Sequence, residues 1–326
     1  MIVYISLPMS GIGRALLGFS ADETAFDTRG FHRGDPSAVR DLERAGAAFH
    51  AGYTAALQDL AAAPETFRVQ DGPSAGFAYE GAGMALCLAD ALSLPHGTGF
   101  SRFVAGPARR SRYTAQVGAG WALARLPRPL WRPVLRQLDP LLGWLAWDGH
   151  GFHQEFFAPG RPHRSPLPGY VGHAVAQGIG RALWFSSCAE PELVARAVAR
   201  YAPRYHADLW SGAGLAAVFT GAPHTDVLRS SAHGHGPALA QGAAFAAKAL
   251  IELGPVTERS RRAVADLAGT GVEEAAAVTD EVLAALDRAP DAPDAPHAAP
   301  PSGLPVYEAW RRGIAARLSS GAPSVL

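Results

Sequence analysis

The chain has 326 residues, of which 48% are hydrophobic and 18% are charged, and its formal net charge is zero. This size allows a substantial core, and the lack of a basic excess argues against a nucleic-acid-binding protein. The longest apolar stretch, residues 126–147, is interrupted by three arginines and Asp139, so we expect no membrane span. Cys87 and Cys188 lie far apart in apolar segments, which favours buried free thiols and a cytoplasmic location.

The predicted elements are nearly all helical. Strand-like alternation occurs only at MIVYISL (1–7) and, weakly, at RFVAG (102–106), and the start does not have the pattern of a secretory signal. Alanine-rich runs with apolar residues three and four apart predict helices over residues 42–60, 82–92, 191–201, 238–253 and 273–286.

A proline- and aspartate-rich segment follows these helices and predicts an extended loop. After it, LPVYEAWRRGIAARL predicts an amphipathic helix that docks back on the body. We therefore predict an all-α protein with four parts. These are an N-terminal arm (1–27), a single helical repeat domain (28–287), a proline-rich loop (288–303), and a C-terminal helix with its tail (304–326).

Glycine-containing segments of two kinds alternate along the chain. The A segments AGYTAAL, VGAGWAL, QGIGRAL and QGAAFAA are anchored at Gly52, Gly118, Gly178 and Gly242. The B segments YEGAGMAL, WDGHGFHQ, WSGAGLAA and LAGTGVEE are anchored at Gly81, Gly149, Gly212 and Gly269. Glycine inside a helix costs about 1 kcal/mol relative to alanine, so its recurrence indicates close helix packing. We predict four helical hairpins that close into a toroid around an apolar cavity.

Residues that break this pattern are the candidates for function. His150 and His153 stand where the other B segments mostly carry alanine, and Arg181 is the only charge at its position in the A segments. Carboxyl and imidazole groups in an apolar cavity have shifted pKa values that suit acid/base catalysis. The predicted catalytic residues are Glu80, Asp148, His150, His153, Glu155 and Arg181. The structural alternative is a histidine capped by a neighbouring carboxylate at a helix end.

No metal ligand set and no cofactor is predicted. The two histidines lack the spacing of a zinc protease, and GIGRALLG (11–18) lacks the third glycine of a dinucleotide fingerprint. There is no phosphate-loop motif and no GxSxG nucleophile motif. The histidine-rich turn AHGHG (232–236) is typical of a solvated loop.

Aromatic residues cluster on or beside the glycine segments and indicate the kind of ligand. A cavity that they line suits a long hydrophobic molecule such as a polyene or an isoprenoid chain. Their faces also stabilise a transient carbocation. The predicted substrate-binding residues are Tyr79, Trp121, Trp147, Phe152, Trp184 and Trp210.

Several joined segments, among them GFAYEGAGMAL, DPLLGWLAWDGHGFHQEFF, QGIGRALWF, ADLWSGAGLA and YEAWRRGI, carry a resemblance to a known family. From about Thr28 to Ile314, the chain resembles bacterial enediyne biosynthesis proteins of the UnbL type. The resemblance implies a role beside polyketide synthases that release linear polyenes, with polyketide-pathway proteins as partners, and it implies no particular catalytic residues. The chain departs from the family in being compact at 158–168 and proline-rich at 288–302.

The sequence therefore predicts an enzyme that cyclises or rearranges a long unsaturated chain in an aromatic cavity. One alternative is a non-standard terpene cyclase that uses an isoprenyl diphosphate, although the DxDD signature is absent. The other alternative is a non-catalytic protein that carries the polyene for a partner enzyme.

Overall fold

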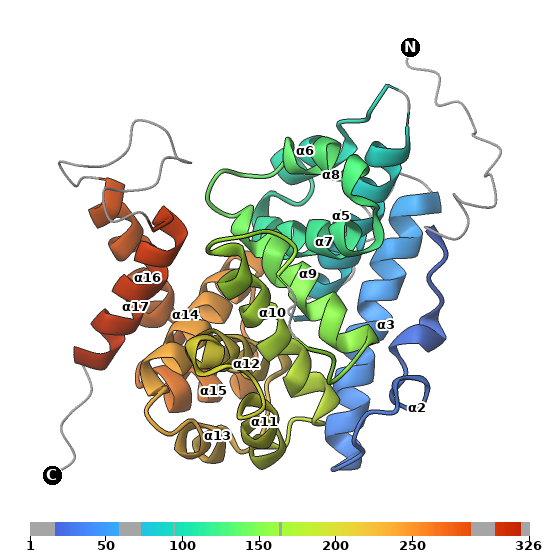
Figure 1. Ribbon diagram of the computed structural model, residues 1–326. Helices are drawn as coiled ribbons and strands as arrows, with labels where there is room; N and C mark the ends of the chain where they lie inside the picture. The colour runs from blue at the N-terminus through green and yellow to red at the C-terminus, as the bar shows by residue number, and fades with distance from the viewer. Residues whose placement is uncertain (1–16, 59–72, 94, 163–164, 288–303, 321–326) are drawn as a thin grey trace, which may run out of the picture.

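Helices form all the regular structure of the residues that the computed structural model describes, which are 17–58, 73–93, 95–162, 165–287 and 304–320 (Figure 1). The α-helices are α2 (Phe26–Arg29), α3 (Pro36–Gln58), α5 (Pro73–Leu92), α6 (Gly99–Ala105), α7 (Arg112–Arg125), α8 (Trp131–Leu135), α9 (Trp144–Phe157), α10 (Val171–Ser186), α11 (Pro191–Val198), α12 (His206–Thr220), α13 (Thr225–Ser231), α14 (Gly236–Leu253), α15 (Glu258–Ala268), α16 (Val272–Asp287) and α17 (Val306–Ser320). Short 3₁₀ turns occur at η1 (Ala21–Thr24), η2 (Arg109–Ser111), η3 (Arg128–Leu130) and η4 (Pro203–Tyr205). The all-α prediction is confirmed for this part of the chain.

Each predicted helix coincides with an observed one, but the strand prediction at RFVAG is wrong. These residues belong to α6, where Phe100 and Phe103 are buried on one side of the helix. The Asp90 carboxylate accepts hydrogen bonds from the backbone N–H groups of Gly99 and Phe100 and so caps the start of this helix. MIVYISL and the proline-rich segment lie outside the described residues.

Seven helices form the body, and each packs against the next in the order α3, α5, α7, α9, α10, α12 and α14. Glycines permit this close packing. A Cβ atom on Gly118 would lie 1.9 Å from the carbonyl oxygen of Glu80 in α5, and one on Gly120 would lie 1.8 Å from that of Ala146 in α9. The first glycine of the pair thus meets the preceding helix and the second meets the following one.

The same rule holds on α5, α9, α10 and α12, so the A and B segments are one kind of unit. The repeated element is a single helix rather than a hairpin. It has a G-x-G pair on the five inner helices and a single packing glycine, Gly52 or Gly242, on α3 and α14 at the ends of the series. The fourth B segment does not belong to the series. Gly269 ends α15 in the left-handed conformation (φ +72°), and Gly271 precedes α16 with no atom within 4 Å of a Cβ placed on it. These two glycines serve a helix end and a turn, not helix packing.

The last helix, α17, packs against α14 and α16 at one side of the molecule (Figure 1). Its Tyr307, Trp310 and Ile314 side chains are buried, so the predicted docking of this amphipathic segment is confirmed. Among the described helices, none is both long and apolar enough to span a bilayer.

Candidate functional site

Three charged side chains meet inside the protein. Glu80 of α5, Asp148 of α9 and Arg181 of α10 are all buried. The Arg181 guanidinium donates to Asp148 Oδ1 at 2.5 Å and to Glu80 Oε2 at 3.4 Å. Trp121 Nε1 donates to the other oxygen of Glu80 at 2.9 Å. One arginine is therefore shared by two buried carboxylates.

The glycine contacts place these groups. A Cβ atom on Gly178 would lie 1.7 Å from the carbonyl oxygen of Asp148, so α9 and α10 touch at the residue that carries the carboxylate. Arg181 follows Gly178 by almost one helical turn and therefore reaches Asp148 across this contact. The packing of Gly118 on Glu80 fixes α5 against α7 in the same way.

Burial sets the protonation of this cluster. It raises the pKa of Glu80 to about 7, and the positive charge of Arg181 only partly opposes this rise. Burial also raises the pKa of Asp148, again against the opposing effect of Arg181. For Arg181, burial lowers the pKa but the two carboxylates outweigh it, so the guanidinium stays charged. A pKa of about 7 allows Glu80 to exchange a proton near neutral pH.

An apolar cavity adjoins the cluster. It is bounded by side chains of α5, α7, α9, α10, α12, α14 and α17, and contains about 700 Å³ of space between atoms, its mouth included. Glu80, Asp148 and Arg181 belong to its polar wall, together with Thr114, Thr220 and Lys248. Its aromatic lining residues are Phe77, Tyr113, Phe185, Phe219, Phe245 and Trp310. Little of the space is wide enough for water, so a ligand requires some of these side chains to move.

One oxygen atom at this wall lacks a partner. Asp148 Oδ2 is buried and makes no hydrogen bond with the described residues. An unpaired buried carboxylate oxygen is costly to a protein unless a proton or a ligand occupies it. Asp148 Oδ2 is therefore a point at which a proton or a ligand can be held.

A second, smaller cavity lies on the other side of the cluster. Glu80, Arg181, Phe77 and Phe185 line both cavities. The second one is also lined by Trp121 and Phe152, whose ring centroids are 5.2 Å apart. Arg181 lies over the Phe152 ring, 5.0 Å from its centroid. The charged cluster thus stands between two aromatic spaces.

The remaining predicted catalytic residues lie elsewhere. His150 is buried against Trp131 and Trp147, and burial lowers its pKa to about 4. His153 is half-buried beside Trp121 and Phe157, and its pKa is lowered by burial and by nearby positive charge. Neither histidine lines the two cavities that flank Arg181.

Glu155 is also separate from the cluster. It accepts hydrogen bonds from the backbone of Gly160 and from the Tyr201 hydroxyl. Burial raises the pKa of this carboxyl. The position lies at two grooves near the α9–α10 loop, so the structure gives Glu155 the role of a local hydrogen-bond acceptor.

The predicted aromatic residues divide in the same way. Trp121 and Phe152 line the second cavity. Tyr79 packs beside Phe103, Trp147 packs beside Trp131, and Trp184 donates to the Thr220 hydroxyl, while Trp210 is buried. None of these last four lines the two cavities. The cavity aromatics Phe77, Phe185, Phe219, Phe245 and Trp310 were missed, although the four phenylalanines lie on helices of the series, within about five residues of a packing glycine.

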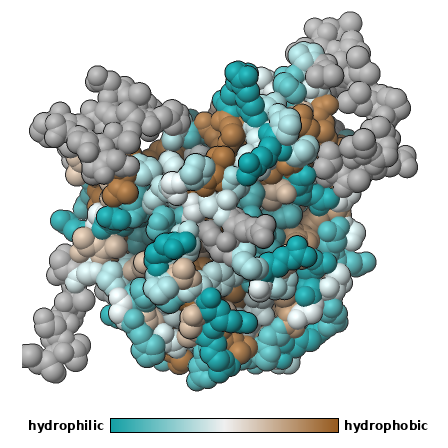
Figure 2. All heavy atoms as spheres, in the orientation of Figure 1, coloured by the Kyte–Doolittle hydropathy of each residue, from teal (hydrophilic) through white to brown (hydrophobic). Residues whose placement is uncertain are grey.

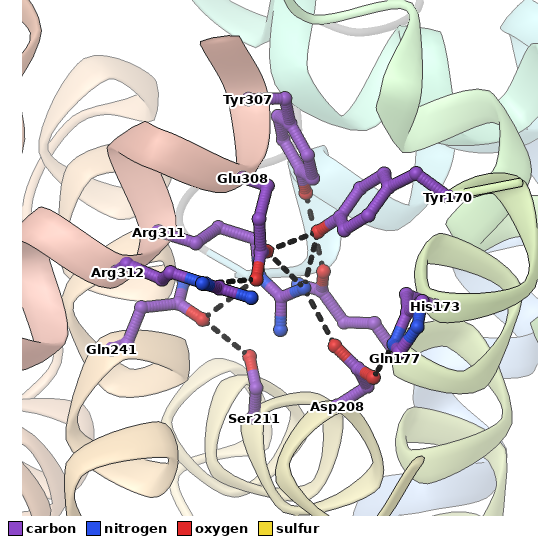
Figure 3. A network of polar contacts seen from close by, with 10 residues as sticks. All are labelled: Tyr170, His173, Gln177, Asp208, Ser211, Gln241, Tyr307, Glu308, Arg311 and Arg312. Atoms are coloured by element: carbon purple, nitrogen blue, oxygen red, sulfur yellow. Dashed lines mark hydrogen bonds and ion pairs between the residues drawn. The ribbon is translucent and has the colours of Figure 1, made fainter. Parts of the chain in front are cut away.

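A second buried polar network ties α17 to the body (Figure 3). Arg311 donates to Asp208 Oδ1 and to the Tyr170 hydroxyl, each at 2.7 Å, and to Gln241 Oε1 at 3.1 Å. Tyr307 donates to Gln177 Oε1 at 3.2 Å. No local motif marks this network, because its members come from α10, α12, α14, α17 and the residue before α10.

No metal site is found in the described part of the chain, where no three or more His, Cys, Asp and Glu side chains gather suitably. Both cysteines are free and buried, as the sequence predicts.

Comparison with known proteins gives a family but no function. A family profile described as "Protein of unknown function (DUF1702)" matches residues 9–318, and the chain belongs to this family. No curated protein matches the chain. No solved structure matches it.

Proposed function

We propose that this DUF1702 protein binds a long unsaturated hydrocarbon chain among its helices and rearranges or cyclises it by acid/base catalysis. The observation that carries the proposal is the shared arginine: two buried carboxylates and one guanidinium lie together in the wall of a mainly apolar cavity. A carrier protein needs the apolar cavity but gains nothing from three buried charges, because such groups are costly to bury.

Glu80 is the proposed proton donor and acceptor. A carboxyl group with a pKa of about 7 exists in both protonation states near neutral pH, which is the condition for efficient proton exchange. Glu80 donates a proton to one carbon of the polyene, and a carboxylate at the cluster removes a proton from another carbon. The product is an isomer of the substrate, so no oxidant or reductant is required.

The surroundings suit the cation that forms between these two steps. The faces of Phe77, Phe185 and Trp310 border the cavity and stabilise positive charge through their π electrons. Arg181 holds the carboxylates in place, and its positive charge opposes the rise that burial causes in the pKa of Asp148. A linear polyene is favoured as the substrate because protonation gives a delocalised cation, and the sequence resemblance to enediyne biosynthesis proteins agrees with it. The predicted toroidal closure of the helices is part of this proposal, since six helices of the series border one cavity.

Deuterium transfer from solvent tests the proposal. The purified protein is incubated in D₂O with a linear conjugated polyene hydrocarbon, and separately with farnesyl and geranylgeranyl diphosphate, and products are analysed by mass spectrometry. We expect an isomerised polyene that carries deuterium, formed by the wild type and lost in Glu80→Gln. Glu155→Gln, which changes a buried carboxyl away from the cavity, is the matched control and should retain activity.

Polyene binding, followed by quenching of tryptophan fluorescence, separates catalysis from folding. Glu80→Gln should bind the polyene as tightly as the wild type. Turnover of a diphosphate instead of the polyene would replace the proposal with the terpene cyclase alternative. Binding of the polyene without conversion by the wild type would leave the carrier alternative.

A further inference from the structure

The positive charge of the chain is concentrated in one segment. Eight arginines and no acidic residue lie between Asp90 and Asp139. The chain is neutral overall, so the remaining residues carry an acidic excess of the same size. Segregation of this kind gives one face of a protein a positive potential even when its net charge is zero.

The short helices of this segment lie on one side of the molecule. It forms α6, η2, α7, η3 and α8, and α6 and α8 lie side by side at the top of Figure 1. A hydrogen bond from the backbone N–H of Ser101 to Gln137 Oε1 joins the start of α6 to the residues that follow α8. The arginines, all but one of them exposed, are Arg102, Arg109, Arg110, Arg112, Arg125, Arg128, Arg132 and Arg136, with Arg125 half-buried. We call this surface the arginine face.

Part of this charge is not neutralised by the protein. Arg112 pairs with Glu252 at 3.3 Å, and Arg128 donates to the Pro166 carbonyl at 2.6 Å. Within the described residues, no ion pair is found for Arg109, Arg110, Arg132 or Arg136. Four exposed guanidinium groups are therefore available to an anionic partner.

Apolar side chains lie among these charges. Leu135 of α8 is 36% exposed, which makes it one of the most exposed large hydrophobic residues described, and Leu130 of η3 is half-buried. Figure 2 shows hydrophobic and hydrophilic residues intermixed over the top of the molecule. Arginine together with exposed leucine is a combination found on surfaces that lie in the interface of a membrane.

We propose that the arginine face binds the surface of an anionic lipid bilayer. The partner is chosen by charge and by the accompanying apolar side chains, since anionic headgroups and the apolar region beneath them satisfy both. The arginine face is also close to the aromatic cavity. Its η2 turn contacts α14 and is followed by Tyr113 at the start of α7. Tyr113 and Lys248 of α14 both line that cavity. A hydrophobic ligand dissolved in the bilayer then has a short route to the protein. The membrane proposal depends on the charge and the apolar side chains of this surface and stands whether or not the cavity is catalytic.

Sedimentation with lipid vesicles tests it. The full-length protein is mixed with vesicles of phosphatidylcholine alone or with a third of phosphatidylglycerol, at low and at physiological salt. We expect at least tenfold tighter binding to the anionic vesicles and a marked loss of binding as salt rises. Equal binding to the two kinds of vesicle, or none to either, would overturn the proposal and would leave an acidic protein as the partner to seek.

Matched variants locate the surface. Replacing Arg109, Arg110, Arg132 and Arg136 by glutamine should reduce vesicle binding by about 600-fold, at roughly fivefold for each of the four arginines. Four exposed arginines outside the segment, Arg40, Arg196, Arg200 and Arg262, form the control set with the same change in net charge. If the control set loses as much binding as the first, then net charge rather than the arginine face is responsible, and the proposal is wrong. Thermal unfolding of both variants checks that neither set disrupts the fold.

Discussion

Glu80→Gln should change the pH dependence of protein stability in a defined direction. Burial raises the pKa of Glu80 from 4.5 to about 7 in the folded protein. A carboxyl group with a raised folded-state pKa contributes stability that is fully present below the unfolded pKa and is lost as the pH rises through the folded one. From the difference between 4.5 and about 7, this loss amounts to roughly 3 kcal/mol. Glutamine matches the protonated carboxyl in shape and does not ionise.

The measurement is the free energy of unfolding from urea titrations at several pH values between 4 and 8. The variant should equal the wild type near pH 4 and exceed it by roughly 3 kcal/mol near pH 8. The variant must be compared with the wild type at each pH, because His150 titrates as well. Its pKa is lowered to about 4, so it reduces the stability of both proteins as the pH falls. Ser211→Ala changes the equivalent position on α12 without a titrating group, and its difference from the wild type should be constant. A constant difference for Glu80→Gln as well would refute the assignment of a raised pKa to this carboxyl.

Three further changes test the packing and the assignment of the site. Gly149→Ala should destabilise the protein by about 3 kcal/mol or more, because its Cβ would lie 1.9 Å from a carbonyl oxygen of α7. Its control is Gly271→Ala, which should change the unfolding free energy by less than about 0.5 kcal/mol. Arg311→Met should destabilise the protein by about 3–5 kcal/mol, because it leaves buried carboxylates without their cation. The side chain of Arg312 is 66% exposed, so Arg312→Met should destabilise the protein by less than about 1 kcal/mol. His150→Gln should retain deuterium transfer to the polyene, because this side chain lines neither cavity; loss of transfer with normal binding would return His150 to the catalytic residues.

Comparison within the chain could find Arg181 but could not separate it from the two histidines. All three were selected because they differ from equivalent residues near other glycines of the series. His150 differs for a local reason: Trp131 of α8 packs on it. Its counterparts in α5 and α12 are fully buried alanines. A deviation from a repeat therefore indicates a different environment, and only coordinates show whether that environment is a cavity or an extra helix.

The glycine spacing carried more information than the hairpin interpretation used. Two glycines separated by one residue lie about 200° apart around a helix, so they face opposite neighbours. That geometry alone predicts a series of single helices, each packed closely on both sides, as Gly118 and Gly120 show. The composition of LAGTGVEE also marks this segment as an exception. Its threonine and glycine stand beside two glutamates, which suits the start of a helix rather than its middle.

The network around Arg311 shows why distant partners escape such reasoning and why they bear on the site. Its residues are separated by up to 141 positions along the chain, and each is an unremarkable polar residue in its own segment. Yet Tyr307 bonds to Gln177, which precedes Arg181 by about one turn of α10, and Trp310, one residue before Arg311, forms part of the cavity wall. The contacts that anchor α17 are thus continuous with those that hold the carboxylate cluster. The cavity is narrow, so part of its wall must move when a ligand enters. The seven helices of the body are held together by contacts at their glycines. Because α17 is not one of these seven helices, its displacement disturbs the fewest of those contacts.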